Sequence, residues 1–153
     1  MAHEIVKNDA NNQLAQAVSS QTGEIRNLRV DDLTLGQVTV GVPPSMYSLL
    51  ANASTNPLNV KNAAGRLFHA NLTNNSAAVK YFRLYNLAVA PTVGTSAPYT
   101  VITLPATSSK EVTFGPTGLA FSVGIAIAIT GAAPDLDATA VAAGDVRVLL
   151  AYM

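Results

Sequence analysis

Two histidines and three clustered aspartates are the residues of this chain best suited to chemistry. His3 and His69 lie far apart in the sequence, so they do not have the spacing of a metal site. To act as a general base, His69 would need a nucleophile and an orienting acid, and no recognisable pattern supplies them. We expect a structural role for His69, with base catalysis as the alternative.

The aspartates lie in the stretch APDLDATAVAAGD, at positions 135, 137 and 145. A calcium loop needs a third oxygen ligand, then a glycine and a distant glutamate, whereas Ala138 follows Asp137. Asp135 and Asp145 could form the carboxylate pair of a glycosidase, but that site also needs an aromatic-lined cleft. The chain has no Trp and is 6% aromatic. We expect a surface turn; a weak cation site and a small hydrolase are the alternatives.

Two further patterns could mark a binding site. Tyr81, Arg83 and Tyr85 alternate and would share one strand face as a cation–π ladder, which is typical of a scaffold or interface and, as the alternative, of a carbohydrate site. The glycines from position 115 to 131 are too dispersed for a phosphate loop, and Gly124 indicates close backbone approach within a strand. The sequence thus predicts no catalytic residue, no cofactor and no metal.

Composition excludes several classes of function. Charged residues make up 12% of the chain, about half the usual share of roughly 25%, which suggests that a partner covers part of the surface. The net charge is zero and the basic residues are scattered, so we expect no nucleic-acid partner. The absence of cysteine excludes disulfides and thiolate sites.

Neither a membrane partner nor secretion is expected. No apolar run reaches the length of a membrane span. The first residues, MAHEIVKNDANNQ, have no apolar signal-peptide core. The sequence therefore predicts a protein made in the cytoplasm.

Composition shifts at Pro43-Pro44, since every Tyr and Phe of the chain follows this pair. Residues 1–43 are predicted to form an N-terminal extension, and residues 44–153 a single domain. In the extension, the run from Asp9 to Gln21 carries a thin apolar stripe at helical spacing and predicts a weak helix.

A short repeat follows in the extension. From residue 27 the chain reads NLRVD, DLTLG and QVTVG, with aliphatic residues at the second and fourth positions of each unit. One interpretation is an irregular strand or hairpin; the other is an extended segment that buries its aliphatic residues against copies of itself. The candidate interface residues of the repeat are Leu28, Val30, Leu33, Leu35, Val38 and Val40.

The domain after Pro44 predicts strands and turns almost throughout. The turn Asn74-Asn75-Ser76, flanked by aromatic and β-branched residues, is the clearest hairpin signal. Turn residues recur at intervals typical of an antiparallel β-sandwich or jelly-roll of about eight strands. The predicted fold class is therefore all-β, with an extended N-terminal arm.

One predicted strand, from Leu119 to Thr130, has an unusual face. In FSVGIAIAITG the odd-numbered residues, Val123 among them, form an ordinary core face. The opposite face lacks bulk and charge, which indicates that another surface lies against it. We predict a subunit interface there, formed by Gly124, Ala126 and Ala128; a loop or the arm of the same chain is the alternative.

Two long stretches resemble small virion proteins of tailed bacteriophages. They are VKNAAGRLFHANLTNNSAAVKYFRLYNLAVAPTVGTSAP and GLAFSVGIAIAITGAAPDLDATAVAAGDVRVLLAY, and the resemblance spans roughly residues 60–152. The motifs that carry it are Ala64-Gly65, Asn74-Asn75, Leu84-Tyr85-Asn86, Val93 to Pro98, Gly118 to Thr130 and Gly144-Asp145-Val146.

The resemblance implies a structural, cofactor-free virion protein. It suggests a capsid decoration (cement) protein, commonly a homotrimer, that lies on the outer capsid surface and binds the major capsid protein. The alternative is a tail, fibre or neck module, for which receptor binding through host glycans is one expected role. In the first case the N-terminal arm would anchor the protein to the capsid through Ile5, Val6, Leu14 and Val18.

Overall fold

The computed structural model describes residues 15–18, 25–28 and 43–153. The chain divides into two compact units between Pro43 and Pro44, where we expect the domain boundary. In the first unit, β1 (Ala15–Val18) pairs antiparallel with β2 (Ile25–Leu28). The helix expected from Asp9 to Gln21 is therefore wrong for Ala15–Val18, because pairing with β2 satisfies the backbone of a sequence that has weak helix propensity.

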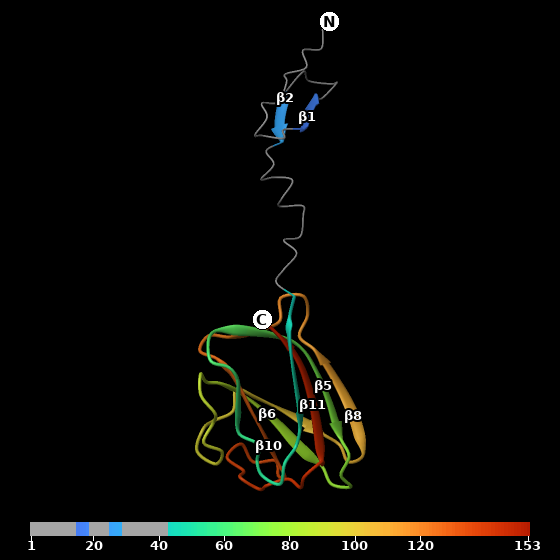
Figure 1. Cartoon of the computed structure of the whole chain (residues 1–153), viewed down its shortest axis with the longest axis vertical. Coiled ribbons are helices and arrows are strands. Elements are labelled where there is room, and N and C mark those ends of the chain that lie inside the picture. The colour runs from blue at the N-terminus through green and yellow to red at the C-terminus, as the bar shows by residue number, and fades with distance from the viewer. Residues whose placement is uncertain (1–14, 19–24, 29–42) are drawn as a thin grey trace, which may run out of the picture. The chain divides into compact units, whose positions relative to one another are not determined.

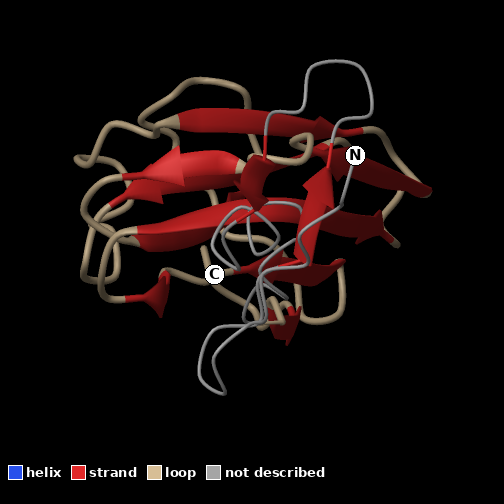
Figure 2. Ribbon diagram, turned by 90° about the horizontal axis from the view of Figure 1, so that it is seen from above, coloured by secondary structure: helices blue, strands red, loops and turns tan. Residues whose placement is uncertain are grey.

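The second unit consists of nine strands in two antiparallel sheets (Figures 1 and 2). The prediction of an all-β, sandwich-like fold is confirmed. The described residues include no helix that could cross a membrane. The first sheet has the order β3 (Ser45–Leu50), β11 (Val146–Tyr152), β5 (Gly65–Asn74) and β8 (Ser108–Thr113), and β9 (Leu119–Phe121) also pairs with β5. The second has the order β4 (Leu58–Lys61), β10 (Ile125–Thr130), β6 (Lys80–Asn86) and β7 (Thr100–Leu104).

The core lies between the two sheets and follows the alternation of each strand. In the second sheet, Leu84 lies opposite Ile127, and in the first sheet Leu72 lies opposite Val148. All four side chains are fully buried. Each contributes roughly 2 kcal/mol to the free energy of unfolding by leaving water.

The predicted strand from Leu119 to Thr130 is in fact two strands in different sheets. β9 pairs with β5, whereas β10 pairs with β4 and β6. Val123, which we expect in the core, lies between them and is 48% exposed. Between β9 and β10 the chain passes from one sheet to the other, and at Gly124 its backbone lies close to two other segments. A Cβ atom there would lie 2.6 Å from the Leu87 carbonyl oxygen and 2.7 Å from that of Lys61. Only glycine lets the backbones approach so closely.

The hairpin expected around Asn74-Asn75-Ser76 is also wrong. β5 and β6 belong to different sheets, so the turn is a corner between layers. The Asn74 side chain is buried and its Nδ2 donates to the carbonyls of Ala78, Leu104 and Pro105, at 2.9, 3.1 and 2.9 Å. These bonds join this corner to the one between β7 and β8, and they satisfy carbonyl groups that the sheets leave unpaired.

Replacing Gly124 with Ala should lower the free energy of unfolding. The added methyl group would meet backbone atoms of Lys61, Leu87 and Ala88, which cannot rotate away. Overpacking of this kind typically costs about 1–3 kcal/mol, which urea denaturation would measure. In the control Ser122→Thr, the methyl group is added at an exposed neighbour, and we expect a change within about 0.5 kcal/mol. Equal stability of both variants would contradict the close approach.

Candidate functional site

The face of β10 without bulk or charge is covered by the chain itself. Ala126 lies opposite Tyr85 of β6, and Ala128 lies opposite Arg83. These four residues and Gly124 are buried within the single chain. The predicted subunit interface at Gly124, Ala126 and Ala128 is therefore wrong, and a loop of the same chain covers this face. The residues are small because the large side chains of the neighbouring strand need the space above them.

Two loops complete the cover of the second sheet. Leu87 and Val93, from the connection between β6 and β7, pack on the cluster formed by Tyr85, Ala126 and Ala128. A Cβ atom at Gly94 would lie 3.4 Å from the Ala138 Cβ, so this loop meets the one between β10 and β11. Burial raises the pKa of the Tyr85 hydroxyl beneath them.

Arg83 holds the second of these loops in place. Its Nε donates to Thr130 Oγ1 at 2.9 Å, and its Nη2 donates to the carbonyls of Ala132 and Pro134 at 2.9 and 2.6 Å. Its Nη1 donates to the Asp135 carbonyl at 3.1 Å, whereas the Asp135 carboxylate is 3.9 Å away and largely exposed. Arg83 thus serves as an anchor for loop carbonyls, a role that differs from the ladder suggested by its spacing.

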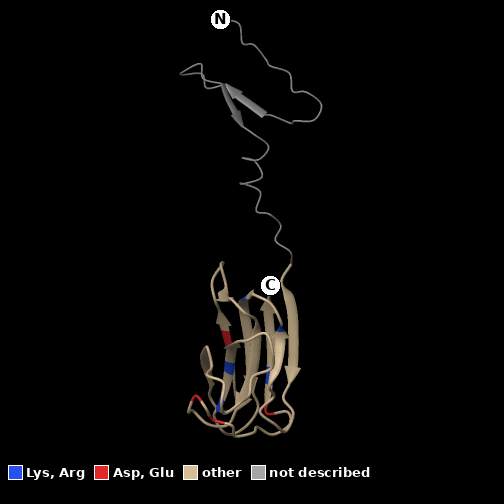
Figure 3. Cartoon of the chain, turned by 90° about the vertical axis from the view of Figure 1, so that its left-hand side faces the viewer, with Lys and Arg blue, Asp and Glu red and all other residues tan. Residues whose placement is uncertain are grey.

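The aspartates shape the loop between β10 and β11. Asp137 accepts hydrogen bonds from the backbone N–H groups of Ala132 and Thr139, at 2.9 and 3.1 Å. Partial burial raises the pKa of Asp137, but these bonds and one from the Thr139 hydroxyl outweigh it, so the pKa is lowered overall. Acidic residues are sparse elsewhere in the domain (Figure 3).

Asp145 pairs with Lys80 across the same end of the domain. The Lys80 Nζ lies 2.9 Å from Asp145 Oδ2, and both side chains are mostly buried. The hydrogen bond from Lys80 lowers the pKa of Asp145. Asp135, Asp137 and Asp145 therefore have roles in loop structure, and no three His, Cys, Asp or Glu residues in the described part of the chain are placed to hold a metal ion.

His69 lies on the outer face of the first sheet. Its Nδ1 is 3.5 Å from Thr113 Oγ1 and 3.7 Å from Glu111 Oε1, both on β8. On the opposite edge of this face, Met46 and Leu50 of β3 are 58% and 59% exposed. In contrast to the second sheet, this face therefore presents large side chains to solvent.

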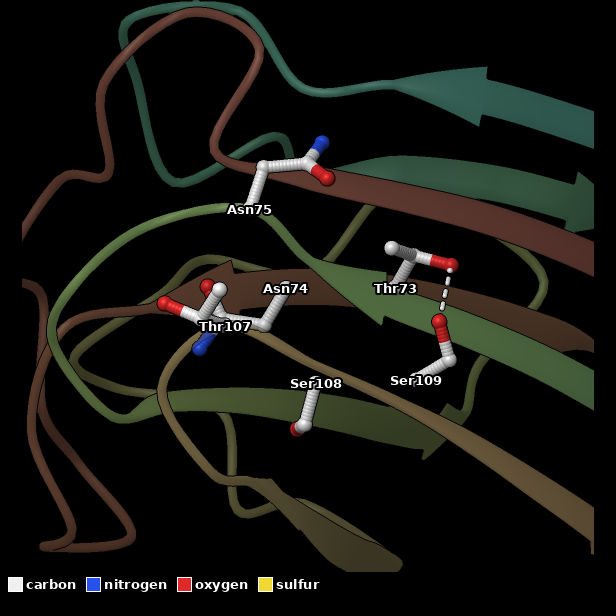
Figure 4. Close-up of a pocket in the computed structure, with 6 residues that line it drawn as sticks. All are labelled: Thr73, Asn74, Asn75, Thr107, Ser108 and Ser109. Carbon is white, nitrogen blue, oxygen red and sulfur yellow. Dashed lines mark hydrogen bonds between the residues drawn. The ribbon is translucent and has the colours of Figure 1, made fainter.

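A polar pocket lies where β5 ends and β8 begins (Figure 4). It has a volume of about 220 Å³ and only hydroxyl and amide side chains line it. Thr73 and Ser109 share a hydrogen bond of 3.0 Å at its margin. Thr107 has a φ of 48°, which is uncommon for a β-branched residue. The six lining residues are Thr73, Asn74, Asn75, Thr107, Ser108 and Ser109.

The sequence gives little sign of this pocket. Asn74-Asn75 and Thr107-Ser108-Ser109 each predict an ordinary turn. Their proximity depends on the pairing of Asn74 with Ser108 across two adjacent strands. Only that long-range register brings the polar groups together.

Most candidate residues of the extension lie outside the described residues. Val18 belongs to β1 and Leu28 to β2. The structure therefore leaves their assignment to a capsid anchor or subunit interface as a prediction. The candidates outside the described residues are Ile5, Val6, Leu14, Val30, Leu33, Leu35, Val38 and Val40.

No protein family, curated protein or solved structure matches this chain. Its function must therefore be argued from the domain itself. Within residues 44–153, three features are candidates for contact with a partner: the exposed outer face of the first sheet, the polar pocket, and the loops over the second sheet.

Replacing Arg83 with Met should loosen the loop at residues 131–137. The loop carbonyls would lose their buried donor, at a cost of about 1–3 kcal/mol. Thermal unfolding would measure the loss, and faster amide exchange in the loop would localise it. The matched control is Asp135→Asn, which alters an exposed carboxylate and should change stability by less than about 1 kcal/mol. Unchanged exchange in Arg83→Met would contradict the anchoring role.

Stability should depend on pH through Asp145. In the folded chain, the pKa of Asp145 lies below its ordinary value of 3.8. The ionised carboxylate therefore stabilises the fold at pH values above 3.8. This contribution is lost as the pH falls through the lower, folded pKa. Urea midpoints measured between about pH 5 and pH 2 should fall on acidification, and less steeply for Asp145→Asn. Equal slopes in the parent protein and in Asp145→Asn would rule out this role for Asp145.

Proposed function

We propose that this chain is a capsid decoration protein of a bacteriophage, which binds the outer surface of the assembled head and stabilises it. The observation that carries the proposal is the organisation of the chain: a sandwich-like β domain joined at Pro43-Pro44 to a separate N-terminal unit. The low share of charged residues, 12%, is consistent with a surface that is partly covered in an assembly. The resemblance of residues 60–152 to phage virion proteins supports the same role.

We further propose that the domain is a jelly-roll and that residues 1–43 form its arm. With β9 set aside, the first sheet contains the first, eighth, third and sixth strands of the domain, and the second contains the second, seventh, fourth and fifth. Each sheet thus takes strands from both halves of the chain, as two interleaved Greek keys do. Viral capsid domains often have this fold, although a fold alone does not establish a function.

Stabilisation would follow from selective binding. A protein that binds the assembled shell, but not its separated subunits, shifts the assembly equilibrium by mass action. Arg83 and the Lys80–Asp145 pair fasten the loop between β10 and β11, and a loop held in this way would lose little conformational entropy on binding. The arm would bind the major capsid protein, and the protein would associate with copies of itself, as a homotrimer if it follows the proteins that it resembles.

The polar pocket favours a second candidate, a tail or fibre module that binds host glycans. Its hydroxyl and amide groups match the hydrogen-bonding groups of a sugar. Against this candidate, no aromatic side chain lines the pocket to stack on a sugar ring. Copy number separates the two candidates, since a decoration protein is present in hundreds of copies per virion and a tail module in a few dozen or fewer.

The decisive experiment adds the purified protein to heads that lack it. We expect saturable binding to intact heads, no binding to dissociated capsid subunits, and a higher temperature of head disruption. An otherwise identical chain without residues 1–43 should bind at least tenfold more weakly if the arm anchors it. Failure to bind heads, or binding with no gain in heat resistance, would refute the decoration role, and recovery of the protein only with tails would favour the second candidate.

A further inference from the structure

Apart from the three-residue β9, four strands lie at the edges of the two described sheets, and they differ in how they are protected from pairing with another chain. β8 carries Lys110 and Glu111, and charged side chains disfavour edge-to-edge pairing. Lys110 Nζ also donates to the Thr103 carbonyl of β7 at 3.3 Å, so this lysine covers part of the β7 edge as well. β4 has four residues, follows Pro57 and ends at Lys61. Short length, proline and lysine are all common protections of an edge.

Like β4, β3 follows a proline, Pro44, but it has neither the short length nor a charged residue. Its six residues, SMYSLL, include no charge and no proline. Among the strands that the structure describes, it pairs with β11 alone and ends the sheet on its other side. Met46 and Leu50 project from its outer side and are more than half exposed. An uncharged, apolar edge of this length is a template for another strand.

We propose that β3 pairs antiparallel with β3 of a second copy of this chain, with Ser48 on the two-fold axis. In this register Met46 lies opposite Leu50 of the partner subunit, and Leu50 lies opposite the partner subunit's Met46. On the inner side, Tyr47 lies opposite the partner subunit's Leu49. The most exposed apolar residues of β3 thereby cover each other, and the two first sheets become one continuous sheet.

The neighbouring strand supports a second copy as the occupant. Arg147 of β11 lies beside Leu50, and Ala151 lies beside Met46. In the proposed register, the row that contains Arg147 continues through Leu50 to Met46 and Ala151 of the partner subunit. The two Arg147 side chains therefore lie in different rows, and no like charges face each other across the axis. The contact is self-complementary, as a two-fold interface must be.

This contact is independent of the proposed capsid role. By itself it gives a dimer, and where trimers form through another surface it joins neighbouring trimers. It does require that neither the extension nor another protein occupies the β3 edge. The experiment therefore uses the full-length chain alone in solution.

A single cysteine at position 48 tests the register directly, because the natural chain has none. Directly opposed residues of antiparallel strands have Cα atoms about 4.5–5.5 Å apart, which is within the range that a disulfide spans. Under mild oxidation, Ser48→Cys should form a disulfide-linked dimer in high yield. Ser109→Cys, which changes another exposed serine on the charged edge strand β8, is the matched control and should cross-link at least tenfold more slowly.

A second variant tests the association without a covalent link. Ser48→Lys would place two ammonium groups on the axis, and we expect the dissociation constant measured by sedimentation to rise at least tenfold, with a larger effect at low salt. Both variants change an exposed side chain, and circular dichroism would verify that they fold. Absence of cross-linking at position 48, or an equal rate at position 109, would overturn the proposal. So would an unchanged dissociation constant for Ser48→Lys.

Discussion

Arg83 is buried on the outer face of the second sheet, and a buried guanidinium group needs hydrogen-bond acceptors for its N–H groups. Much of the structure around this sheet supplies those acceptors or the space for the side chain. Its donors reach the carbonyls of residues 132, 134 and 135, which fixes the course of the loop between β10 and β11. The alanines of β10 leave room for Arg83 and Tyr85, and the loops then cover both. The second sheet consequently has apolar or buried surface on both sides.

The two outer faces of the domain are therefore unequal. One is packed beneath loops of the same chain, and the other presents Met46, Leu50 and His69 on strands that no part of the described domain covers. Within the described domain, the first sheet therefore has the more open outer face. This asymmetry also explains why both faces of β10 are apolar. Its small residues lie in the interior, in a second, minor core.

Alternation along the strands made the all-β class and most strand positions predictable from the sequence, because each sheet has a core face. The sequence could not show which strands pair. Asn74-Asn75-Ser76 looks like a hairpin, but the buried Asn74 amide joins two corners of the sandwich instead. Likewise, Ala126 and Ala128 are small and apolar, as residues at an interface often are. The structure shows that they lie beside Tyr85 and Arg83 of β6 and that Leu87 and Val93 pack on this cluster. Both errors concern contacts between residues distant in the sequence, which local propensity does not encode.

The position of β11 has a consequence for how the chain reaches its folded state. This strand follows the other strands of the domain in sequence, yet it lies between β3 and β5 and pairs with both. During synthesis β3 therefore emerges from the ribosome long before β11, with which it pairs. The first sheet can close only after nearly the whole domain has been made, which gives slow, late folding dominated by distant contacts. Until then, the β3 edge that β11 pairs with in the folded domain lacks that partner.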